Sequence, residues 1–226
     1  MTAVEATAAH SALPRAAGRL YDRLRPSDRY IHRTRDEALL ALLRRHGVAS
    51  LGGRRVLELG CGEGSFVRSL LSYGAEPDLL EGVDLRPGRA AAARRLVPGA
   101  RLTAADGAAL PYRNGVFDLV FAFTFFSSMV DPAPRRRAAA EALRVLRGGG
   151  LLIVYDFWIN PLNQRVRPLG AAELRAVFAP QRVEVERVTL APPIVRALGG
   201  RPALCRSLER LPLLRTHLLA AVTKES

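Results

Sequence analysis

The sequence predicts an α/β protein built on a parallel sheet, and two stretches carry that prediction. Residues 56–66, VLELGCGEGSF, are an apolar run that ends among three glycines, which is typical of a buried strand turning sharply into a helix. Residues 117–123, FDLVFAF, form a continuous apolar run after Asn114-Gly115. Such a run indicates a central parallel strand that is covered on both faces.

Length and composition set the broad class. The chain has 226 residues, of which 49% are hydrophobic, so it can bury its own core and is expected to form one domain over residues 1–226. Cys61 and Cys205 make neither a disulfide framework nor a metal cluster, so no metal is expected. The first five residues lack a signal-peptide pattern, and no apolar run has membrane-spanning length. These features predict a soluble, cytoplasmic protein that is a monomer or a homodimer.

The formal net charge is +13, which is compatible with a nucleic acid, an anionic membrane surface or a phosphorylated substrate as partner. Lys224 is the only lysine, and the arginines are scattered from Arg15 to Arg215 in a chain rich in alanine, glycine and proline. A GC-rich coding bias explains this pattern as well as a polyanion does, and a nucleic-acid footprint would be expected to cluster. We therefore expect a small molecule, rather than a nucleic acid, as the partner.

The region before the first strand is expected to be helical. Residues 1–12 read as a disordered tail, and Leu13–Arg25 has apolar residues at helical spacing. Thr34-Arg35-Asp36-Glu37 resembles a capping box, which predicts a second helix from about Arg35 to a C-terminal Gly47. Tyr30 and His32 would then lie between the two helices.

The glycine-rich turn is a predicted ligand site. Gly60, Gly62 and Gly64 recur at every second position, as needed where the backbone adopts positive φ or lies flush against a bound group. The following helix, about Ser65–Tyr73, points its amide-rich N-terminus at the same place. The second strand, Leu79–Asp84, ends in an acid about 20 residues later, which suits both hydroxyls of a ribose. The alternative is a turn aspartate that caps the next helix.

The G-x-G-x-G spacing, with Glu58 two residues before its first glycine, resembles the first motif of class I S-adenosylmethionine (SAM) methyltransferases, E/D-x-G-x-G-x-G. Dinucleotide enzymes use G-x-G-x-x-G instead. Further motifs follow in the family's order across residues 55–156. Residues 106–112 resemble D-x-x-x-L-P-F, FDLVFA resembles the fourth-strand motif, and LRVLRGGGLLIVYDF resembles L-R-V-L-K-P-G-G-x-L, with a glycine triplet in place of the usual proline and glycines.

The resemblance implies a class I methyltransferase (Rossmann-like) fold, with a seven-stranded, mostly parallel sheet, an antiparallel last strand and helices on both faces. It implies SAM as cofactor and S-adenosylhomocysteine as product, with helices over residues 13–50 covering the site. Asp84 is expected at the ribose and Asp106 at the adenine. The full set expected to bind the cofactor is Glu58, Gly60, Cys61, Gly62, Gly64, Asp84, Leu85, Asp106, Gly107 and Phe123.

The other expected elements follow from apolar runs and turn residues. They are a helix over Pro87–Leu96, a strand over Arg101–Ala105, a helix over Pro134–Leu146, strands over Leu151–Tyr155 and Arg182–Thr189, an excursion over residues 190–215 with a helix near Ala203–Arg210, and a last strand over Thr216–Val222. In the excursion, Leu204, Leu208 and Leu211 make an apolar stripe beside Arg206 and Arg210. The stripe fits a membrane surface, although packing into a core is the commoner use.

Methyl transfer from a sulfonium uses an activated donor, so the protein mainly positions the reactants and supplies a base for a hydroxyl acceptor. The candidate bases, in order, are His217, His32, Asp131 and Asp156. His217 is first because, in the implied fold, the antiparallel last strand begins where the parallel strands end. The residues expected to bind the acceptor offer stacking, hydrogen bonds or positive charge, and are Tyr30, Trp158, Asn160, Asn163, Arg165, Arg167 and Thr216.

The predicted function is SAM-dependent methylation of a small molecule, with O-methylation of a sugar or secondary-metabolite hydroxyl as the expected reaction. The family's common histidines near Ser127 and Ser128 are absent, which leaves the acceptor chemistry open. One alternative is an RNA methyltransferase, which only the charge favours. Another is a non-catalytic protein of this fold that binds or regulates.

Overall fold

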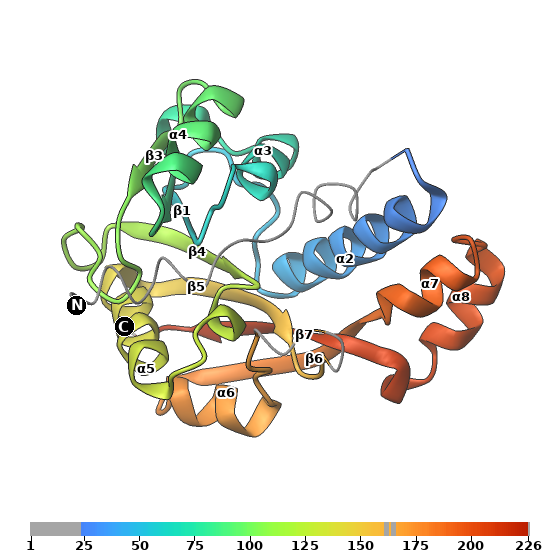
Figure 1. Cartoon of the computed structure of the whole chain (residues 1–226). Coiled ribbons are helices and arrows are strands. Elements are labelled where there is room, and N and C mark those ends of the chain that lie inside the picture. Colours follow the sequence, from blue (N-terminus) through green and yellow to red (C-terminus); the bar gives the residue numbers. More distant parts are fainter. Residues whose placement is uncertain (1–23, 161–162, 164–165, 226) are drawn as a thin grey trace, which may run out of the picture. The chain divides into compact units, whose positions relative to one another are not determined.

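The computed structural model describes residues 24–160, 163 and 166–225 (Figure 1). The helices are α2 (Pro26–Arg45), α3 (Ser65–Ser72), α4 (Pro87–Leu96), α5 (Pro132–Val145), α6 (Ala171–Phe178), α7 (Pro192–Ala197) and α8 (Pro202–Glu209), with short 3-10 turns η2 (Pro77–Leu79), η3 (Phe126–Ser128) and η4 (Pro212–Leu214). The strands are β1 (Val56–Leu59), β2 (Leu80–Asp84), β3 (Arg101–Ala104), β4 (Phe117–Phe123), β5 (Leu146–Phe157), β6 (Arg182–Leu190) and β7 (Arg215–Thr223). No helix in this described part is long and apolar enough to cross a membrane.

The chain divides into two compact units. The first contains Met1–Leu40 and Arg187–Thr216, and the second contains Ala41–Glu186 and His217–Ser226. The boundary falls inside α2, β6 and β7, so each of these elements has residues in both units. The expectation of a single domain over residues 1–226 stays a prediction.

Seven strands form one sheet in the order β3-β2-β1-β4-β5-β7-β6. β1 pairs in parallel with β2 and β4, β2 with β3, and β4 with β5, whereas β7 runs antiparallel to β5. The predicted sheet, mostly parallel with an antiparallel last strand, is confirmed. The strand order reverses between β1 and β4, and in open α/β sheets ligands bind at the carboxyl ends of the strands on either side of such a point.

Different helices cover the two faces of the sheet in the second unit (Figure 1). Alternate residues of a strand point to opposite faces. Leu57 and Val120 lie in a core cluster with side chains of α5 and α6. On the opposite face, the rings of Phe121 and Phe123 lie 5.7 and 3.8 Å from the ring of Phe66 in α3. The predicted layers of helices on both faces are therefore confirmed.

Most predicted elements have the expected bounds to within two residues. α4 and β4 match the predicted ranges, and α5 begins two residues earlier than expected. α6 and α7 were not predicted. α6 has only eight residues and buries only Leu174 and Phe178, four positions apart, which is a weak periodic signal.

The predicted start of the second helix is wrong, because α2 begins at Pro26 and contains the segment with Tyr30 and His32. Thr34 is inside the helix, where its Oγ1 donates to the carbonyl oxygens of Tyr30 or Ile31 at 3.2 and 3.3 Å instead of capping a terminus. Proline in the first turn followed by an acid marks the true start. Residues 1–12 and nearly all of the helix predicted over 13–25 lie outside the described residues.

The predicted end of that helix at Gly47 is confirmed. Gly47 has φ of +73°, and its N–H donates to the carbonyl of Arg44 at 3.0 Å. The next amide, of Val48, donates to the carbonyl of Leu43 at 2.9 Å. These two bonds form a Schellman motif, in which glycine relieves the steric cost of the left-handed residue.

β5 is longer than predicted, since it begins at Leu146 and includes the glycine triplet that precedes the expected start at Leu151. Phe117 pairs with Leu146, but Leu119 pairs with Leu151, so β5 carries extra residues between these two pairs. This irregularity is a β-bulge, and Gly149 within it adopts φ of +70°. The triplet therefore bends the strand and does not separate it from the preceding helix.

Candidate active site

The glycine loop joins β1 to α3 at the carboxyl edge of the sheet. Gly60, Gly62 and Gly64 have φ of +70°, +54° and +88°, a region that other residues rarely adopt. The amide of Cys61 donates to the carbonyl of Val83 in β2 at 2.9 Å, and the amide of Gly64 donates back to Cys61 at 2.9 Å. The backbone thus requires glycine at the alternating positions that the sequence singled out.

Asp84 links the end of β2 to this loop. Its Oδ2 accepts the amide N–H of Gly62 at 3.0 Å, and its Oδ1 accepts the amide N–H of Arg86 at 2.9 Å. Burial raises the pKa of Asp84, while the nearby Arg89 and the Gly62 amide oppose that rise. Each oxygen keeps lone-pair capacity beyond its one amide, so this carboxylate can both order the loop and accept hydroxyl groups.

The space around Gly62 fits a bound nucleoside. A side-chain carbon added to Gly62 would meet only Nη1 of Arg89, 4.0 Å away, so the backbone there faces open room. Leu85, next to the ribose candidate Asp84, is 51% exposed. An exposed apolar side chain beside a carboxylate suits the flank of a base and the hydroxyls of its sugar. The residues present therefore fit a nucleoside cofactor such as SAM.

Two other residues near the loop are buried. Glu58 is inside β1, and Cys61 is 4% exposed. Burial, together with the charges of Glu58 and Asp84, raises the pKa of the Cys61 thiol to about 12. Cys61 is therefore a neutral thiol near pH 7 and not a nucleophile. Within the described residues, no group of three or more His, Cys, Asp or Glu side chains is arranged to hold a metal ion.

Asp106 and Gly107 follow β3. Asp106 Oδ1 accepts the amide N–H of Ala108 at 2.8 Å, which orders the turn. A side-chain carbon on Gly107 would lie 2.5 Å from Cζ of Phe125, and one on Gly60 would lie 2.8 Å from Cδ2 of the same ring. Phe125 therefore packs against both glycine positions. The packing of this ring explains why these two residues are glycines.

Phe125 was not predicted as a site residue. It is 8% exposed and belongs to the core cluster. The preceding Thr124 has φ of +49°, an uncommon conformation for threonine, and its amide donates to the carbonyl of Tyr155 at 2.7 Å. The sequence shows two phenylalanines after the strand, but it does not show that the backbone at Thr124 would direct one of them to the glycines.

His217 lies at the beginning of β7 among aromatic rings. Its ring centroid is 4.6 Å from that of Tyr155, with the planes 7° apart, and 4.1 Å from that of Phe157. The antiparallel register pairs His217 with Phe157 near the carboxyl end of β5, as the fold prediction required. His217 is 4% exposed. Phe123 continues the aromatic group, with its centroid 5.2 Å from that of Tyr155.

Asp156 ties together the loops that follow β4 and β5. Its Oδ2 accepts the amide N–H of Ser127 at 2.9 Å, and its Oδ1 accepts the amide N–H of Phe157 at 2.8 Å. The carbonyl of Ser127 in turn accepts the amide N–H of Arg167 at 2.9 Å. Burial raises the pKa of Asp156 to about 6, although these hydrogen bonds and the charge of Arg135 oppose the rise.

Arg135 of α5 completes this connection and was also not predicted. Its side chain is 1% exposed, and Nη1 donates to Glu173 Oε1 at 2.8 Å. Nη2 donates to the carbonyl oxygens of Met129 and Arg167 at 2.8 and 2.9 Å. A buried guanidinium thus holds both loops. The signal in the sequence was weak, because Arg135 is the first of three successive arginines in α5.

The geometry gives structural roles to two of the candidate bases. Asp131 is the N-cap of α5, where its Oδ1 accepts the amide N–H of Ala133 at 2.9 Å. Asp156 is 1% exposed, and both of its oxygens already accept amides. Neither arrangement favours a proton acceptor that faces a substrate.

The loop after β5 holds most of the predicted acceptor residues. Trp158, Asn160 and Asn163 are half-buried, and Arg167 is exposed, with its Nη2 3.9 Å from Glu173. Arg165 lies outside the described residues. The hydrogen bonds from Asp156 and Arg135 fix both ends of this loop, so the structure brings its Arg167 close to the end of β4.

The remaining candidates lie in the first unit. Tyr30 is 3% exposed, and its hydroxyl donates to Glu209 at 2.8 Å, so its pKa is raised by burial and by that carboxylate. This is a structural use of the side chain. Thr216 is half-buried at the start of β7.

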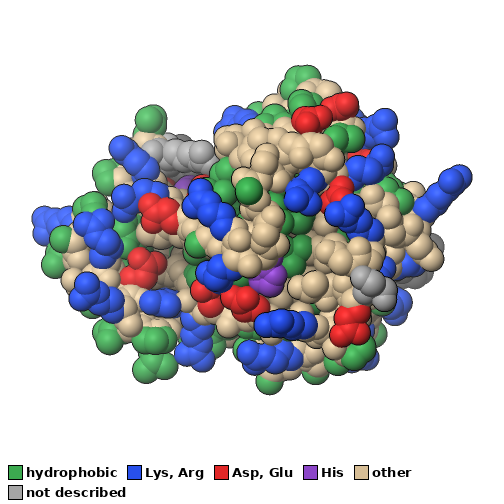
Figure 2. Space-filling view, turned by 180° about the vertical axis from the view of Figure 1, so that it is seen from behind, with side chains coloured by type: hydrophobic (Ala, Val, Ile, Leu, Met, Phe, Trp, Pro, Cys, Tyr) green, Lys and Arg blue, Asp and Glu red, His purple; other side chains and the backbone are tan. Residues whose placement is uncertain are grey.

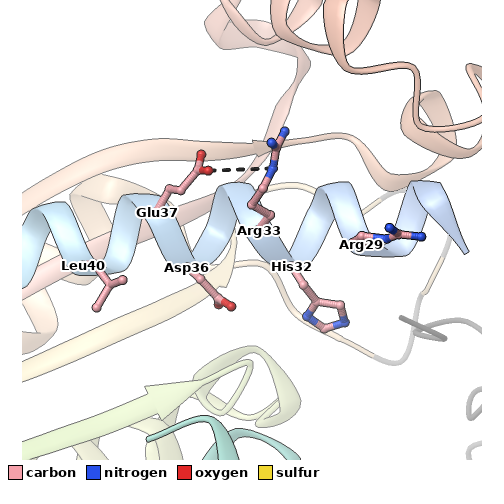
Figure 3. A pocket seen from close by; sticks show the side chains of 6 residues that line it. All are labelled: Arg29, His32, Arg33, Asp36, Glu37 and Leu40. Atoms are coloured by element: carbon pink, nitrogen blue, oxygen red, sulfur yellow. Dashed lines mark ion pairs between the residues drawn. The ribbon is translucent and has the colours of Figure 1, made fainter. Parts of the chain in front are cut away.

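His32 lines an open pocket of about 310 Å³ along one side of α2. Figure 3 shows that His32, Asp36 and Leu40 point to one side of the helix, while Arg33 and Glu37 lie elsewhere around it and form an ion pair at 3.7 Å. The pocket is lined by Arg29, His32, Arg33, Asp36, Glu37 and Leu40. His32 is thus accessible in this unit, unlike Tyr30.

Comparison with known proteins agrees with the fold and the glycine loop. Residues 57–154 match the family model described as a methyltransferase domain. The chain is 32% identical over 138 residues to the phthiotriol/phenolphthiotriol dimycocerosates methyltransferase of Mycobacterium leprae, covering 56% of this chain and 50% of that protein. It is 32% identical over 123 residues to the demethylmenaquinone methyltransferase of Beutenbergia cavernae, covering 53% and 49%. The match spans about half the length of these curated relatives.

A solved structure with the same fold is an S-adenosylmethionine-dependent methyltransferase from Mesorhizobium loti, with a TM-score of 0.59 and 21% identity, covering 81% of this chain and 96% of that one. The sheet order and the glycine loop define a Rossmann-like α/β fold. The fold is that of class I SAM-dependent methyltransferases, and residues 57–154 resemble their methyltransferase domain. SAM is the cofactor of this family.

Proposed function

We propose that this protein is a cytoplasmic enzyme that transfers a methyl group from SAM to a hydroxyl of a small molecule, such as a sugar or a secondary metabolite. The observation that carries the proposal is Asp84, whose carboxylate is tied to the glycine loop beside open room over Gly62. Bound there, SAM supplies an electrophilic methyl group on a sulfonium. The protein then has to position the acceptor and remove its proton.

In the proposed cofactor site, residues of the loop and of the ends of β2 and β3 bind and orient SAM. Asp84 accepts the ribose hydroxyls, Leu85 and Asp106 flank the base, and the loop with Gly60, Gly62 and Gly64 lies against the remainder of the cofactor. The direction of the raised pKa of Asp84 is compatible with this role, since two hydroxyl donors would add hydrogen bonds to the ionised form. Glu58, Cys61, Gly107 and Phe123 complete the proposed cofactor set.

We assign the removal of the proton from the acceptor hydroxyl to a histidine. His217 is the first candidate, because it lies by the carboxyl end of β5 between the rings of Tyr155 and Phe157. A neutral imidazole can accept a proton near pH 7. His32, which lines the pocket on α2, is the second candidate. Asp131 and Asp156 follow, since their carboxylates already serve the backbone.

The proposed acceptor contacts combine stacking with polar groups. Trp158 offers an aromatic face, Asn160 and Asn163 offer amides, and Arg167 offers positive charge. Tyr30, Arg165 and Thr216 remain in the proposed set. The fixed ends of the loop after β5 support this assignment, because a positioned loop loses less conformational freedom when an acceptor binds.

A second candidate is methylation of an acceptor with a lipid-like tail. Two relatives are named for demethylmenaquinone and for phthiotriol dimycocerosates, and the side chains near His217 are aromatic rather than polar. In this reading the methyl group goes to a ring carbon or a hydroxyl of the head group. A flat aromatic head would stack on the rings that surround His217.

The proposal is tested by incubating the protein with SAM and panels of acceptors, and by following the mass of each acceptor. A gain of one methyl group on a sugar or metabolite hydroxyl supports the first candidate, and a gain on an isoprenoid quinol supports the second. Methylation of RNA alone would replace both. Binding of SAM without turnover on any panel would favour the non-catalytic alternative.

A further inference from the structure

We propose that the turn after α8 is a surface that docks on an anionic lipid bilayer. This inference goes beyond methyl transfer and does not rest on it. It starts from three leucines, Leu204, Leu211 and Leu213, which are 46%, 53% and 78% exposed. We call these three residues the leucine patch. The apolar stripe of α8 is thus not fully used as core.

The first unit has a core of its own, and the leucine patch lies outside it. Cys205 is buried in that core, and Leu208 and Leu214 pack against it. The turn is held by the amide of Leu211, which donates to the carbonyl of Leu208, and by the amide of Leu214, which donates to Leu211, both at 3.0 Å. An ordered turn therefore directs its inner leucines to the core and presents Leu211 and Leu213 to solvent.

Three exposed arginines lie close to the patch in the sequence. Arg201, Arg206 and Arg210 are exposed, and within the described part of the chain none of them forms an ion pair. Residues 187–216 contain six arginines and one acid, Glu209, which accepts the hydroxyl of Tyr30. Figure 2 shows basic and hydrophobic side chains toward the left of the view, with a few acidic side chains among them.

Leucines among arginines, with little acidic charge, match the two layers of a membrane surface. Apolar side chains enter the boundary of the acyl chains, while arginines extend to the anionic head groups. A second copy of this chain would bring like charges together, so charge complementarity argues against it. A nucleic acid would satisfy the arginines but would leave the leucines without an apolar partner. An anionic bilayer is the partner that uses both.

The test is flotation of the full chain with vesicles of phosphatidylcholine alone, or of equal parts of phosphatidylcholine and phosphatidylglycerol. We expect binding to the anionic vesicles only, and weaker binding as salt increases. The variant R206E/R210E should bind at least about 30-fold less, because two charges that attract the anionic surface become two that are repelled by it. The matched control R136E/R137E removes the same formal charge from exposed positions of α5 in the other unit, and it should bind like the wild type.

A third variant, L211S/L213S, tests the apolar part and should reduce the binding that remains at high salt. Thermal unfolding of each variant, followed by circular dichroism, verifies that it is folded. Equal loss of binding in both charge variants would overturn the proposal, since net charge alone would then explain the binding. Equal binding to neutral vesicles, or a dimer without lipid that L211S/L213S abolishes, would also overturn it.

Discussion

The proposed cofactor side and the proposed acceptor side of the site are built in different ways. On the proposed cofactor side, Gly60 to Gly64 and Asp84 are joined by backbone amides and one carboxylate. On the acceptor side, buried Arg135 and Asp156 hold loops from separate parts of the chain. In the first arrangement the contacts of Asp84 are local, so changing this side chain is expected to lower stability less than changing Arg135. The second couples the shape of the acceptor site to folding.

The largest expected effect is on turnover. If His217 is the base, His217→Ala should lower kcat by about 10² to 10⁴-fold, the usual contribution of general base catalysis. SAM affinity should stay nearly unchanged, because the proposed cofactor contacts lie on other elements. Single-turnover kinetics with calorimetry separates the two quantities. His46→Ala, which removes a surface histidine paired with Glu184, is the control. Full activity in both His217→Ala and His32→Ala would remove imidazole from the mechanism.

The next effect is on stability and arises on the acceptor side. Arg135→Met should lower the free energy of unfolding by roughly 2 to 6 kcal/mol, because the part-buried carbonyls of Met129 and Arg167 lose their donor, at about 1 to 3 kcal/mol each. Denaturant unfolding measures this quantity. The neighbouring Arg136→Met changes an exposed arginine of the same helix and should be nearly neutral. Equal stability of the two variants would contradict the role assigned to Arg135.

On the cofactor side the expected effect is on binding. Asp84→Ala should weaken SAM binding by about 1.5 to 3 kcal/mol, because the hydroxyls of the ribose lose a charged acceptor. Calorimetric titration measures the loss, and Asp78→Ala, an exposed acid in η2, is the control. The free energy of unfolding should change less than it does in Arg135→Met. If Asp84→Ala lowered the free energy of unfolding more than Arg135→Met does, the proposed difference between the two sides would be wrong.

The smallest expected effect is on how the free energy of unfolding changes with pH. The pKa of Asp156 is raised to about 6 in the fold, so the folded state holds its proton over a range in which the unfolded chain has lost it. The contribution of Asp156 to stability is therefore full below about pH 4 and is lost as pH rises to about 6. Asp156→Asn should remove this part of the slope in denaturant unfolding, and Asp78→Asn should not. An unchanged slope would mean that Asp156 titrates normally.

The same contrast explains how much could be predicted from the sequence. The glycine spacing, Asp84 and the central strand are local patterns with one dominant structural use, and the sheet, its antiparallel last strand and the positive-φ glycines were predicted correctly. Phe125 and Arg135 were missed, because their roles depend on the backbone turn at Thr124 and on a carbonyl 32 residues away in the chain. A single sequence shows neither the turn nor the pairing.

Errors in the elements have a similar origin. The capping-box pattern at Thr34 was outweighed by a helix that had already begun at Pro26, so its hydroxyl bonds to carbonyls in the preceding turn. The glycine triplet before Leu151 lies in a β-bulge of β5, because β4 pairs with β5 on both sides of the triplet. In both places an element continued through a local signal: the helix through the capping-box pattern, and the strand through the glycines.

The most direct test of the central claim is titration of the wild-type protein with SAM, S-adenosylhomocysteine and NAD in a calorimeter. The account predicts saturable binding of the first two at a single site, and no binding of NAD. Binding of NAD without binding of SAM would contradict the assignment of the glycine loop and of the whole family.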